Sequence, residues 1–467
     1  MLTNKPFIYS LRKAKGFVCL SEQSHAAAPS LRLKQFWHFV AGAIVSLLGI
    51  VIISANPGLA ATTICEAPLG WWESKDLEPL FINPNGPAPQ TDCDFHVWSW
   101  TAFVHWMRTD PATGQPYFLA LPTYDDLASG DASRAKIGIR TLVLKPRTLK
   151  PKSMNSFEQA GSHGVLADQN ARAVYYSTHM EPIYFDFTKS YFGVENYKKA
   201  APTLEYPIGA TVLKAAWRVV ATGEDTSGVF TTTATIDLLK SDGKGGIETN
   251  GQTQPNVTVA LVGVHVVGVI KDHPEFVWGT FEQIGNAPDL PPGVDPNSPS
   301  PVSAQNFTFY KGGTSAEASN HLSTHLTIDP TTQKIAPITN VFREFAYGGA
   351  TPDSRVQDII SANQNFQAGI KGHPTINPVF VNYRLIGTAW IFANTLQPGD
   401  GNLDAQTIGS IDLANSTLET FVQRTGTNCF TCHNTSGGAS YPGKDINLSH
   451  IILGPLPNET KTLEANP

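Results

Sequence analysis

Five consecutive residues near the C-terminus, Cys429-Phe430-Thr431-Cys432-His433, have the spacing CxxCH. In c-type haem proteins, two thiols three positions apart reach the two vinyl groups of one porphyrin, and the adjacent histidine coordinates the iron. We therefore predict one covalent haem c, bound through Cys429 and Cys432, with His433 as the proximal iron ligand.

Two other uses of a CxxC pair fit the sequence less well. A structural zinc site normally has a second ligand pair at short spacing, and no other CxxC occurs in the chain. A thiol–disulfide redox motif normally opens a helix after a strand, whereas a helix is expected here from Leu413 to Gln423, directly before the motif. Haem attachment remains the favoured interpretation.

The N-terminal sixty residues have the composition of an export signal. An uncharged stretch over 39–55 follows several basic residues, and the small residues Gly58 and Ala60 suit cleavage before Ala61. We predict that residues 1–60 are a signal peptide and that the protein is exported, to the periplasm or an equivalent lumen, or out of the cell. An uncleaved anchor is the alternative, since 39–55 is at the short end of a membrane span. After cleavage no stable membrane anchor is expected.

Removal of residues 1–60 deletes six Lys or Arg and one Glu, which lowers the formal net charge from −6 to −11. This acidic balance argues against nucleic acid as a partner, because nucleic-acid binding requires clustered Lys and Arg. It permits a basic redox partner protein, whose identity the sequence does not give. Of the remaining cysteines, Cys65 and Cys93 are predicted to form a disulfide in an oxidising compartment.

The mature chain is expected to be mainly β (α+β), with a large β-sandwich-like body over 61–405. Val257–Ile270 is apolar on both alternating faces and is expected at the centre of the sandwich. Other expected strands are 211–220, 230–239, 276–282, 307–310 and 379–391, and expected helices run from Asp94 to Met107 and from Asp353 to about Ile370. Residues 406–467 are expected to form a short helical haem-attachment segment packed on the body.

Several phrases resemble those of large secreted mono-haem cytochrome c family proteins, most of which have no assigned function. The phrases are CDFHVWSWTAF at 93–103, HPEFVWGTFEQIGNAPD at 273–289, NYRLIGTAW at 382–390 and ANSTLETFVQ at 414–423, followed by CFTCH. The resemblance implies an exported protein with one covalent haem near the C-terminus. It implies no substrate.

The second iron ligand is left open by the sequence. No Met follows His433, so the Met ligand of a small cytochrome c domain is missing. The distal candidates are His450, which is the only histidine after the motif, His265 within the apolar strand, and His273, which lies beside Glu275 and an aromatic run. An iron with no second protein ligand is a further alternative.

These alternatives separate two functions. One-electron transfer through a six-coordinate haem is the favoured interpretation. A haem enzyme, peroxidase- or oxidase-like, is the alternative, with an open distal position and His265, His273 or Glu275 as proton-transfer groups. A body that binds a ligand and senses redox state is a third hypothesis. The sequence alone does not decide whether the protein is an enzyme.

Overall fold

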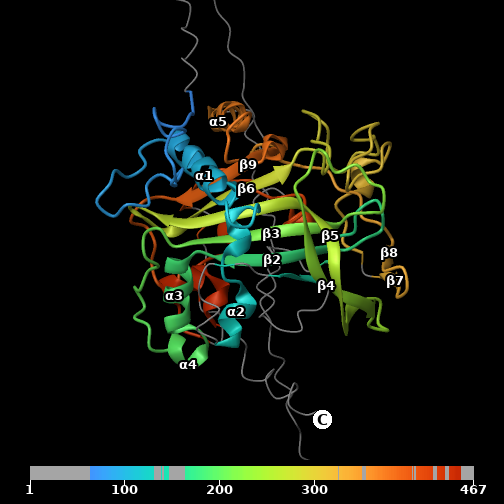
Figure 1. The fold of residues 1–467 in the computed structure, drawn as a ribbon, viewed down its shortest axis with the longest axis horizontal. Helices are drawn as coiled ribbons and strands as arrows, with labels where there is room; N and C mark the ends of the chain where they lie inside the picture. Colours follow the sequence, from blue (N-terminus) through green and yellow to red (C-terminus); the bar gives the residue numbers. More distant parts are fainter. Residues whose placement is uncertain are drawn as a thin grey trace, which may run out of the picture. The chain divides into compact units, whose positions relative to one another are not determined.

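The computed structural model describes residues 64–130, 138, 141–146, 164–323, 325–349, 354–401, 403, 406–423, 429–436 and 441–453. Its main element is an 8-stranded mixed sheet with the strand order β10-β9-β6-β5-β3-β2-β1-β4 (Figure 1). The strands are β1 (Leu142–Pro146), β2 (Val174–Met180), β3 (Thr211–Val219), β4 (Thr231–Ser241), β5 (Ile247–Ile270), β6 (His273–Gln283), β9 (Tyr383–Ile391) and β10 (Thr407–Gly409). Neighbouring strands are antiparallel except for β1 and β4, which pair in parallel.

The expected strands agree with the structure at most positions. β3, β4, β6 and β9 lie within a few residues of their predicted ranges, and β5 ends at Ile270 as expected. Two predictions were wrong: residues 307–310 form only an isolated bridge, and the start of the last predicted strand is a 3-10 helix, η4 (Pro378–Asn382). β5 also starts earlier than predicted, because its polar first half pairs with β4 in a long hairpin.

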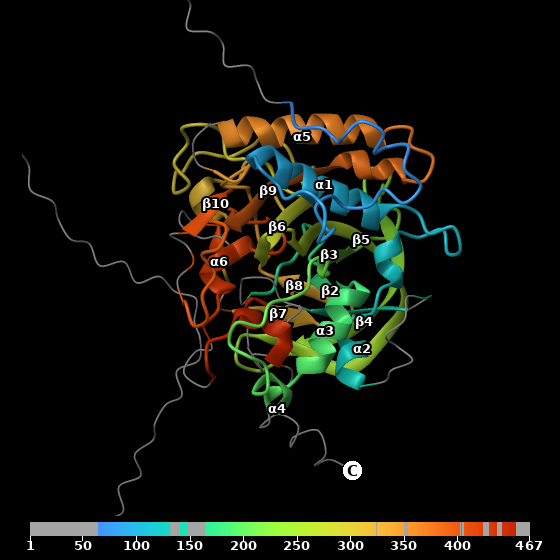
Figure 2. The same cartoon turned by 90° about the vertical axis from the view of Figure 1, so that its left-hand side faces the viewer.

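One face of the sheet is covered by two long helices, α1 (Asp92–Met107) and α5 (Ser354–Ile370), which lie together along that side (Figure 2). Glycines in the strands let α1 come close to the backbone. A Cβ added at Gly268 would lie 2.8 Å from Trp98, and one at Gly279 would lie 2.6 Å from Ser99. We call this side the α1 face.

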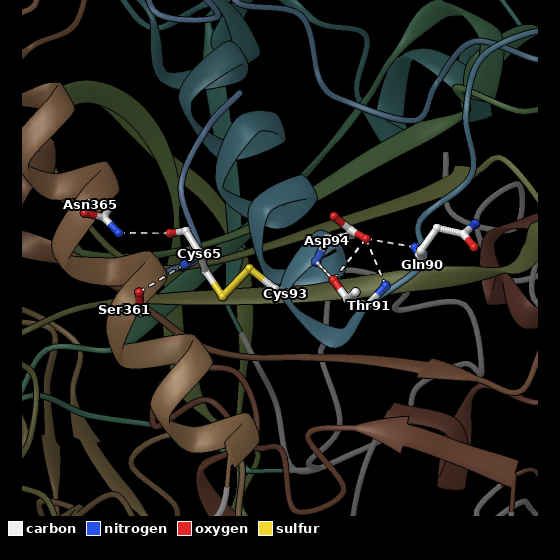
Figure 3. The surroundings of a disulfide bond; sticks show 7 residues. All are labelled: Cys65, Gln90, Thr91, Cys93, Asp94, Ser361 and Asn365. Carbon is white, nitrogen blue, oxygen red and sulfur yellow. Dashed lines mark hydrogen bonds between the residues drawn. A yellow bond between two sulfur atoms is a disulfide. The ribbon is translucent and has the colours of Figure 1, made fainter. Parts of the chain in front are cut away.

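The start of α1 is fixed by a capping box and by a disulfide (Figure 3). The helix was predicted to begin at Asp94, but its N-cap is Thr91. Asp94 is instead the third residue of the helix and accepts hydrogen bonds at the cap. The predicted disulfide between Cys65 and Cys93 is confirmed, with Cα atoms 5.4 Å apart. Cys65 also forms hydrogen bonds with Ser361 and Asn365 of α5. The disulfide and these hydrogen bonds together hold the first described residues against both helices.

The opposite face is covered by the C-terminal segment together with short helices, and we call it the C-terminal face. Its buried side chains include Val267, Trp278 and Ile386 from the sheet, which pack with Phe430 and Ile446. The helices on this side and at the sheet ends are α2 (Tyr124–Ser129), α3 (Pro182–Tyr191), α4 (Val194–Tyr197), α6 (Cys429–Cys432), η7 (Asp445–Leu448) and η8 (His450–Leu453). The remaining short elements are η1 (Tyr117–Ala120), η3 (Ala316–Ala318) and the small hairpin β7 (Thr327–Asp329) with β8 (Lys334–Ala336).

The prediction of a mainly β body with helices is therefore confirmed in its coarse form. The sandwich needs a correction, because the described residues contain one large sheet, and their other sheet has two strands. The centre of β5 is covered on both faces as expected, but by helices on one side and the C-terminal segment on the other. The described residues from 64 onward belong to one compact unit.

The helix predicted over 413–423 was wrong, since only η6 (Thr420–Val422), a 3-10 turn, forms there. The side chains of Asn415 and Thr417 bond to nearby backbone, to each other and to the sheet, and such bonds compete with a regular helix. α5 ends at Ile370 as predicted, while its predicted first residue, Asp353, lies outside the described residues.

The predicted signal peptide and its cleavage site also lie outside the described residues. Within the part that the structure describes, every helix is too short or too polar to cross a bilayer.

Candidate haem-attachment site

The CxxCH motif occupies a one-turn helix, α6, on the C-terminal face of the sheet. Residues three positions apart lie on the same side of a helix, so Cys429 and Cys432 are placed as a pair. The amide of His433 donates to the carbonyl of Cys429 at 2.9 Å, which continues the turn into the histidine. The local fold therefore presents the two cysteines and the histidine together.

The ring of His433 is held in one orientation. Its Nδ1 donates to the carbonyl oxygen of Leu448 at 2.9 Å, and its Nε2 forms no hydrogen bond with the described residues. A carbonyl oxygen only accepts, so the proton sits on Nδ1 and the lone pair on Nε2 is left for a metal. This is the arrangement that a proximal iron ligand requires.

Two aromatic rings contact that imidazole. The indole of Trp278, on β6, has its ring centroid 4.2 Å from that of His433. The ring of His450 stacks on His433 at 4.3 Å, with an angle of 16° between the planes. His433 thus packs between the sheet and the chain that follows the motif.

A row of polar side chains crosses the sheet beside the motif. Lys214 on β3 pairs with His265 on β5, and His265 pairs with Thr280 on β6, so all three point to the C-terminal face. Each is at most 9% exposed. His265 Nε2 lies 2.8 Å from Oε1 of Glu419, a residue of the segment that leads to the motif. We call Lys214, His265 and Thr280 the polar row.

Two ring nitrogens near this row are buried and have no hydrogen-bond partner: Nδ1 of His265 and Nε1 of Trp278. Buried polar atoms without a hydrogen-bond partner are rare, because each loses its bonds to water without a replacement. Their position beside the motif is the signal expected where a polar group of a bound molecule completes the set.

The segment that leads to the motif is fixed to β6 by buried polar contacts. Asn415 Nδ2 donates to Oγ1 of Thr280 and to the carbonyl of Phe281, both at 2.9 Å. Ser416 donates its amide and hydroxyl to the carboxylate of Glu282, each at 2.5 Å. Arg343 pairs with the same carboxylate at 2.6 Å. Through these bonds the sheet positions the approach to the cysteines.

Burial and nearby charges set the protonation states at the motif. Burial, followed by the charges of His450 and Lys214, holds the pKa of His433 well below its usual range. Burial, followed by the charge of Glu419, raises the pKa of the Cys429 thiol well above its usual range. The imidazole is therefore neutral and able to ligate, and the thiol stays protonated at neutral pH. A thiolate redox or nucleophilic role for Cys429 is disfavoured on the same ground.

The structure separates the three distal candidates. His450 is stacked on His433 and its Nε2 lies 3.1 Å from the carbonyl of Cys432, whereas ligands on opposite sides of one iron face each other across it. His273 is paired with Glu275 at 2.8 Å and packs edge-on against Phe95, at the first residues of β6. Of the three candidates, His265 alone combines a place in the polar row with an unused buried ring nitrogen.

The residues present fit a c-type haem in their chemistry. They supply Cys429 and Cys432 for attachment, a neutral His433 whose Nε2 is free, and buried nitrogen atoms without hydrogen-bond partners. Cys429 is a free thiol, whereas Cys432 forms a disulfide in this structure, and attachment through both sulfurs requires that bond to be open. Among the described residues no group of three or more Cys, His, Asp or Glu side chains is arranged to hold a metal ion directly.

Two further features lie apart from the motif. A cavity of about 310 Å³ opens beside β1 and β4, where Leu119, Thr232 and Thr233 line it. The sequence also contains one HxxxH pair, His321 and His325, so the expectation that the chain has no such pair for zinc was wrong. Both histidines are exposed, and Nε2 of His321 bonds to a local carbonyl.

Sequence reasoning missed three residues of the site: Lys214, Trp278 and Glu419. Lys214 could have been noticed, since a lysine in the middle of an otherwise apolar strand is rarely buried without a reason. Trp278 and Glu419 carry no such local signal. Their proximity to His433 and His265 depends on strand order and on the path of the C-terminal segment.

Comparison of the chain with protein-family models, with curated proteins and with solved structures finds no match in any of the three.

Proposed function

We propose that this chain is an exported c-type haem protein that carries one covalent haem and transfers single electrons. The observation that supports it best is the geometry of the motif: a CxxCH turn whose histidine has Nδ1 bound by Leu448 and Nε2 left for iron. The resemblance of several phrases to large secreted mono-haem cytochrome c proteins points to the same class. Residues 406–467 are then the haem-attachment segment and 61–405 the body that carries it.

When bound, the haem supplies an iron that gains and loses one electron. The chain's own residues would bind and orient it. Cys429 and Cys432 form the thioether links, and the Leu448 carbonyl keeps the proton on Nδ1 of His433 and raises the basicity of its ring. Trp278 and the sheet behind it exclude water from one side of that ring. Burial of this kind is one of the factors that set a haem's reduction potential.

The cysteine pattern supports export and attachment together. If the predicted signal peptide is removed, Cys19 goes with it, and four cysteines remain. Cys65 and Cys93 are paired with each other, and Cys429 and Cys432 are the other two cysteines of that mature chain. The proposal therefore includes a mature protein in which both thiols of the motif are reduced before haem is attached.

The test is expression of the full chain in a bacterial host that attaches c-type haem in its periplasm. We expect a haem-stained band after denaturing electrophoresis, a mass increase of one haem, and an absorption spectrum with the low-spin bands of a six-coordinate iron. Replacement of Cys429 and Cys432 together by Ala should remove the covalent haem, while the matched replacement of Cys65 and Cys93 should reduce stability and leave some haem attached. Absence of covalent haem from the exported wild-type protein would refute the proposal.

A haem enzyme with an open distal position is the second candidate. The buried His265–Glu419 pair favours it, because a histidine bonded to a carboxylate beside the iron ligand could transfer protons. Addition of carbon monoxide to the reduced protein separates the two functions. Spectral bands that carbon monoxide does not move support electron transfer, and prompt binding supports the enzyme.

A further inference from the structure

We infer that Lys214 and His265 of the polar row receive the propionate groups of the haem and so fix its position on the sheet. This inference rests on the proposed haem and names residues that no sequence motif assigns to it. A porphyrin attached through its vinyl groups has two carboxylates on its opposite edge. Those carboxylates need cationic or hydrogen-bonding partners wherever they leave water.

Lys214 is placed for this role by the sheet. It lies in the middle of β3 and is 9% exposed, and its side chain shares a face with Trp278, the residue that packs on His433. Its charge acts on three groups of the motif region, Cys429, His433 and His450. A lysine at this depth thus lies close to both the attachment residue and the iron ligand.

His265 contributes a second group on the neighbouring strand. Lys214 and His265 are direct cross-strand partners, and side chains that face each other in this way are about 5 Å apart at Cβ. Nε2 of His265 donates to Glu419, so the buried Nδ1 donates to a propionate when the ring carries its second proton, a form that two neighbouring carboxylates favour. Nε1 of Trp278 is a third buried group without a partner, and it can only donate.

The charges support this assignment over an apolar contact. Glu419, on the segment that leads to the motif, is the acidic partner of His265. A propionate beside the polar row brings a negative charge to the ammonium group of Lys214 and to the ring of His265. It also gives the buried Nδ1 of His265 the hydrogen-bond partner that it otherwise lacks. Short charge-assisted bonds to carboxylates are roughly twice as strong as neutral ones.

The experiment compares Lys214→Met, Lys214→Arg and a control, Lys240→Met, in the exported full-length protein. Methionine keeps an unbranched apolar stem in place of the lysine's, so the sheet can still pack. Lys240 is also on the sheet, but its side chain is exposed and pairs with Glu248. The readouts are haem bound per chain and the midpoint potential of the haem. Midpoint potential responds to charge near the iron, so it reports more than loss of structure.

We expect Lys214→Met to lower haem content severalfold and to shift the midpoint potential of the remaining haem downward. A nearby positive charge favours the reduced iron, which carries one positive charge fewer, so its loss favours the oxidised form. Lys214→Arg should keep both values near wild type, and so should Lys240→Met. Lys214→Met with wild-type haem content and potential would overturn the inference, as would a potential shift of the same size in Lys214→Arg.

His265→Gln tests the second residue, because the amide can still donate to a propionate but ligates iron poorly. We expect the spin state of the iron to be the same in His265→Gln as in the wild type. If the variant instead becomes high-spin and binds carbon monoxide, His265 is the axial ligand and its assignment to a propionate is wrong. Wild-type protein without covalent haem would refute the proposed function, whereas haem-loaded protein with unaffected Lys214 variants would refute this inference alone.

Discussion

The imidazole of His433 lies against the indole of Trp278, with ring centroids 4.2 Å apart and an angle of 41° between the planes. Trp278 belongs to β6, near the centre of the eight-stranded sheet, and is 5% exposed. The histidine of the motif is therefore in direct contact with a buried side chain of the large sheet. This contact makes the large sheet part of the site.

Replacing Trp278 tests that contact. Trp278→Ala removes a buried aromatic side chain and should cost about 3–5 kcal/mol of unfolding free energy, with local loosening of the C-terminal segment. Trp278→Phe keeps an apolar ring and should cost much less. Urea unfolding gives the global effect, and limited proteolysis shows whether cleavage after residue 400 is accelerated. Equal effects of the two replacements would contradict a packing role for the ring.

The buried pair of Glu282 and Arg343 gives a second prediction. Arg343→Met leaves the carboxylate of Glu282 buried without its cation and should destabilise the protein by about 3–5 kcal/mol. The double variant Glu282→Gln with Arg343→Met should be less destabilised than Arg343→Met alone, because no charge is then left uncompensated. Urea unfolding of the wild type and the variants measures both effects.

The exposed pair of Lys198 and Glu195 is the matched control for that experiment. Lys198→Gln should leave the unfolding midpoint unchanged, since ion pairs in water contribute little. If Arg343→Met lowered the free energy of unfolding as little as Lys198→Gln does, the Glu282–Arg343 ion pair would not be what fixes Ser416 to the sheet. The same conclusion would follow if the losses of unfolding free energy in Glu282→Gln and Arg343→Met added up to the loss in the double variant.

The sequence was informative where the signal is local. Alternation and apolar runs located β3, β6 and the second half of β5 closely, and Cys65 and Cys93 were the pair left for a disulfide in an exported chain once the other cysteines were assigned to the signal and the haem. The helix before the motif could not be predicted correctly, because Asn415 and its neighbours satisfy their polar groups against β6, which lies more than one hundred residues earlier. Secondary structure there is decided by tertiary contacts.

The candidate site shows the same division. The CxxCH spacing identified Cys429, Cys432 and His433 from five letters, since the chemistry itself requires that order. The contact of His433 with Trp278 and the pairing of Lys214 with His265 depend on which strands are neighbours. Strand order in this sheet is not the sequence order, so no local pattern could reveal those contacts.

Acid sensitivity is predicted from His96, a fully buried residue of α1 with no partner for either ring nitrogen. Burial lowers its pKa to about 3, below the ordinary value of about 6.5. The unfolded chain then binds the proton more readily, so stability is complete above about pH 6.5 and falls as pH decreases towards about 3. At about pH 4.5 the loss should be about 3 kcal/mol, at about 1.4 kcal/mol for each pKa unit.

His96→Phe removes the titrating ring and keeps most of its volume. We expect the urea midpoint of this variant to depend less on pH than that of the wild type between about pH 7 and pH 4.5. His321→Phe, at an exposed position, should behave as the wild type. A His96→Phe profile parallel to the wild-type profile would show that other groups cause the acid loss.

Gly263 on β5 supplies the last prediction, since the segment before the motif crosses the strand at this glycine. A Cβ added there would lie 2.3 Å from Oγ1 of Thr417, closer than real Cβ atoms pack, and 3.0 Å from Oδ1 of Asn415, which is tighter than most such contacts. Gly263→Ala should therefore push the segment away from the sheet and weaken the Asn415 bonds to β6, at a cost of about 1–3 kcal/mol, the usual range for overpacking. Gly228→Ala is the control, because its added Cβ would meet only the end of Asn382, at 4.0 Å. Haem content should fall in Gly263→Ala and stay unchanged in Gly228→Ala. Wild-type stability and haem content in Gly263→Ala would mean that the segment does not depend on close approach to β5.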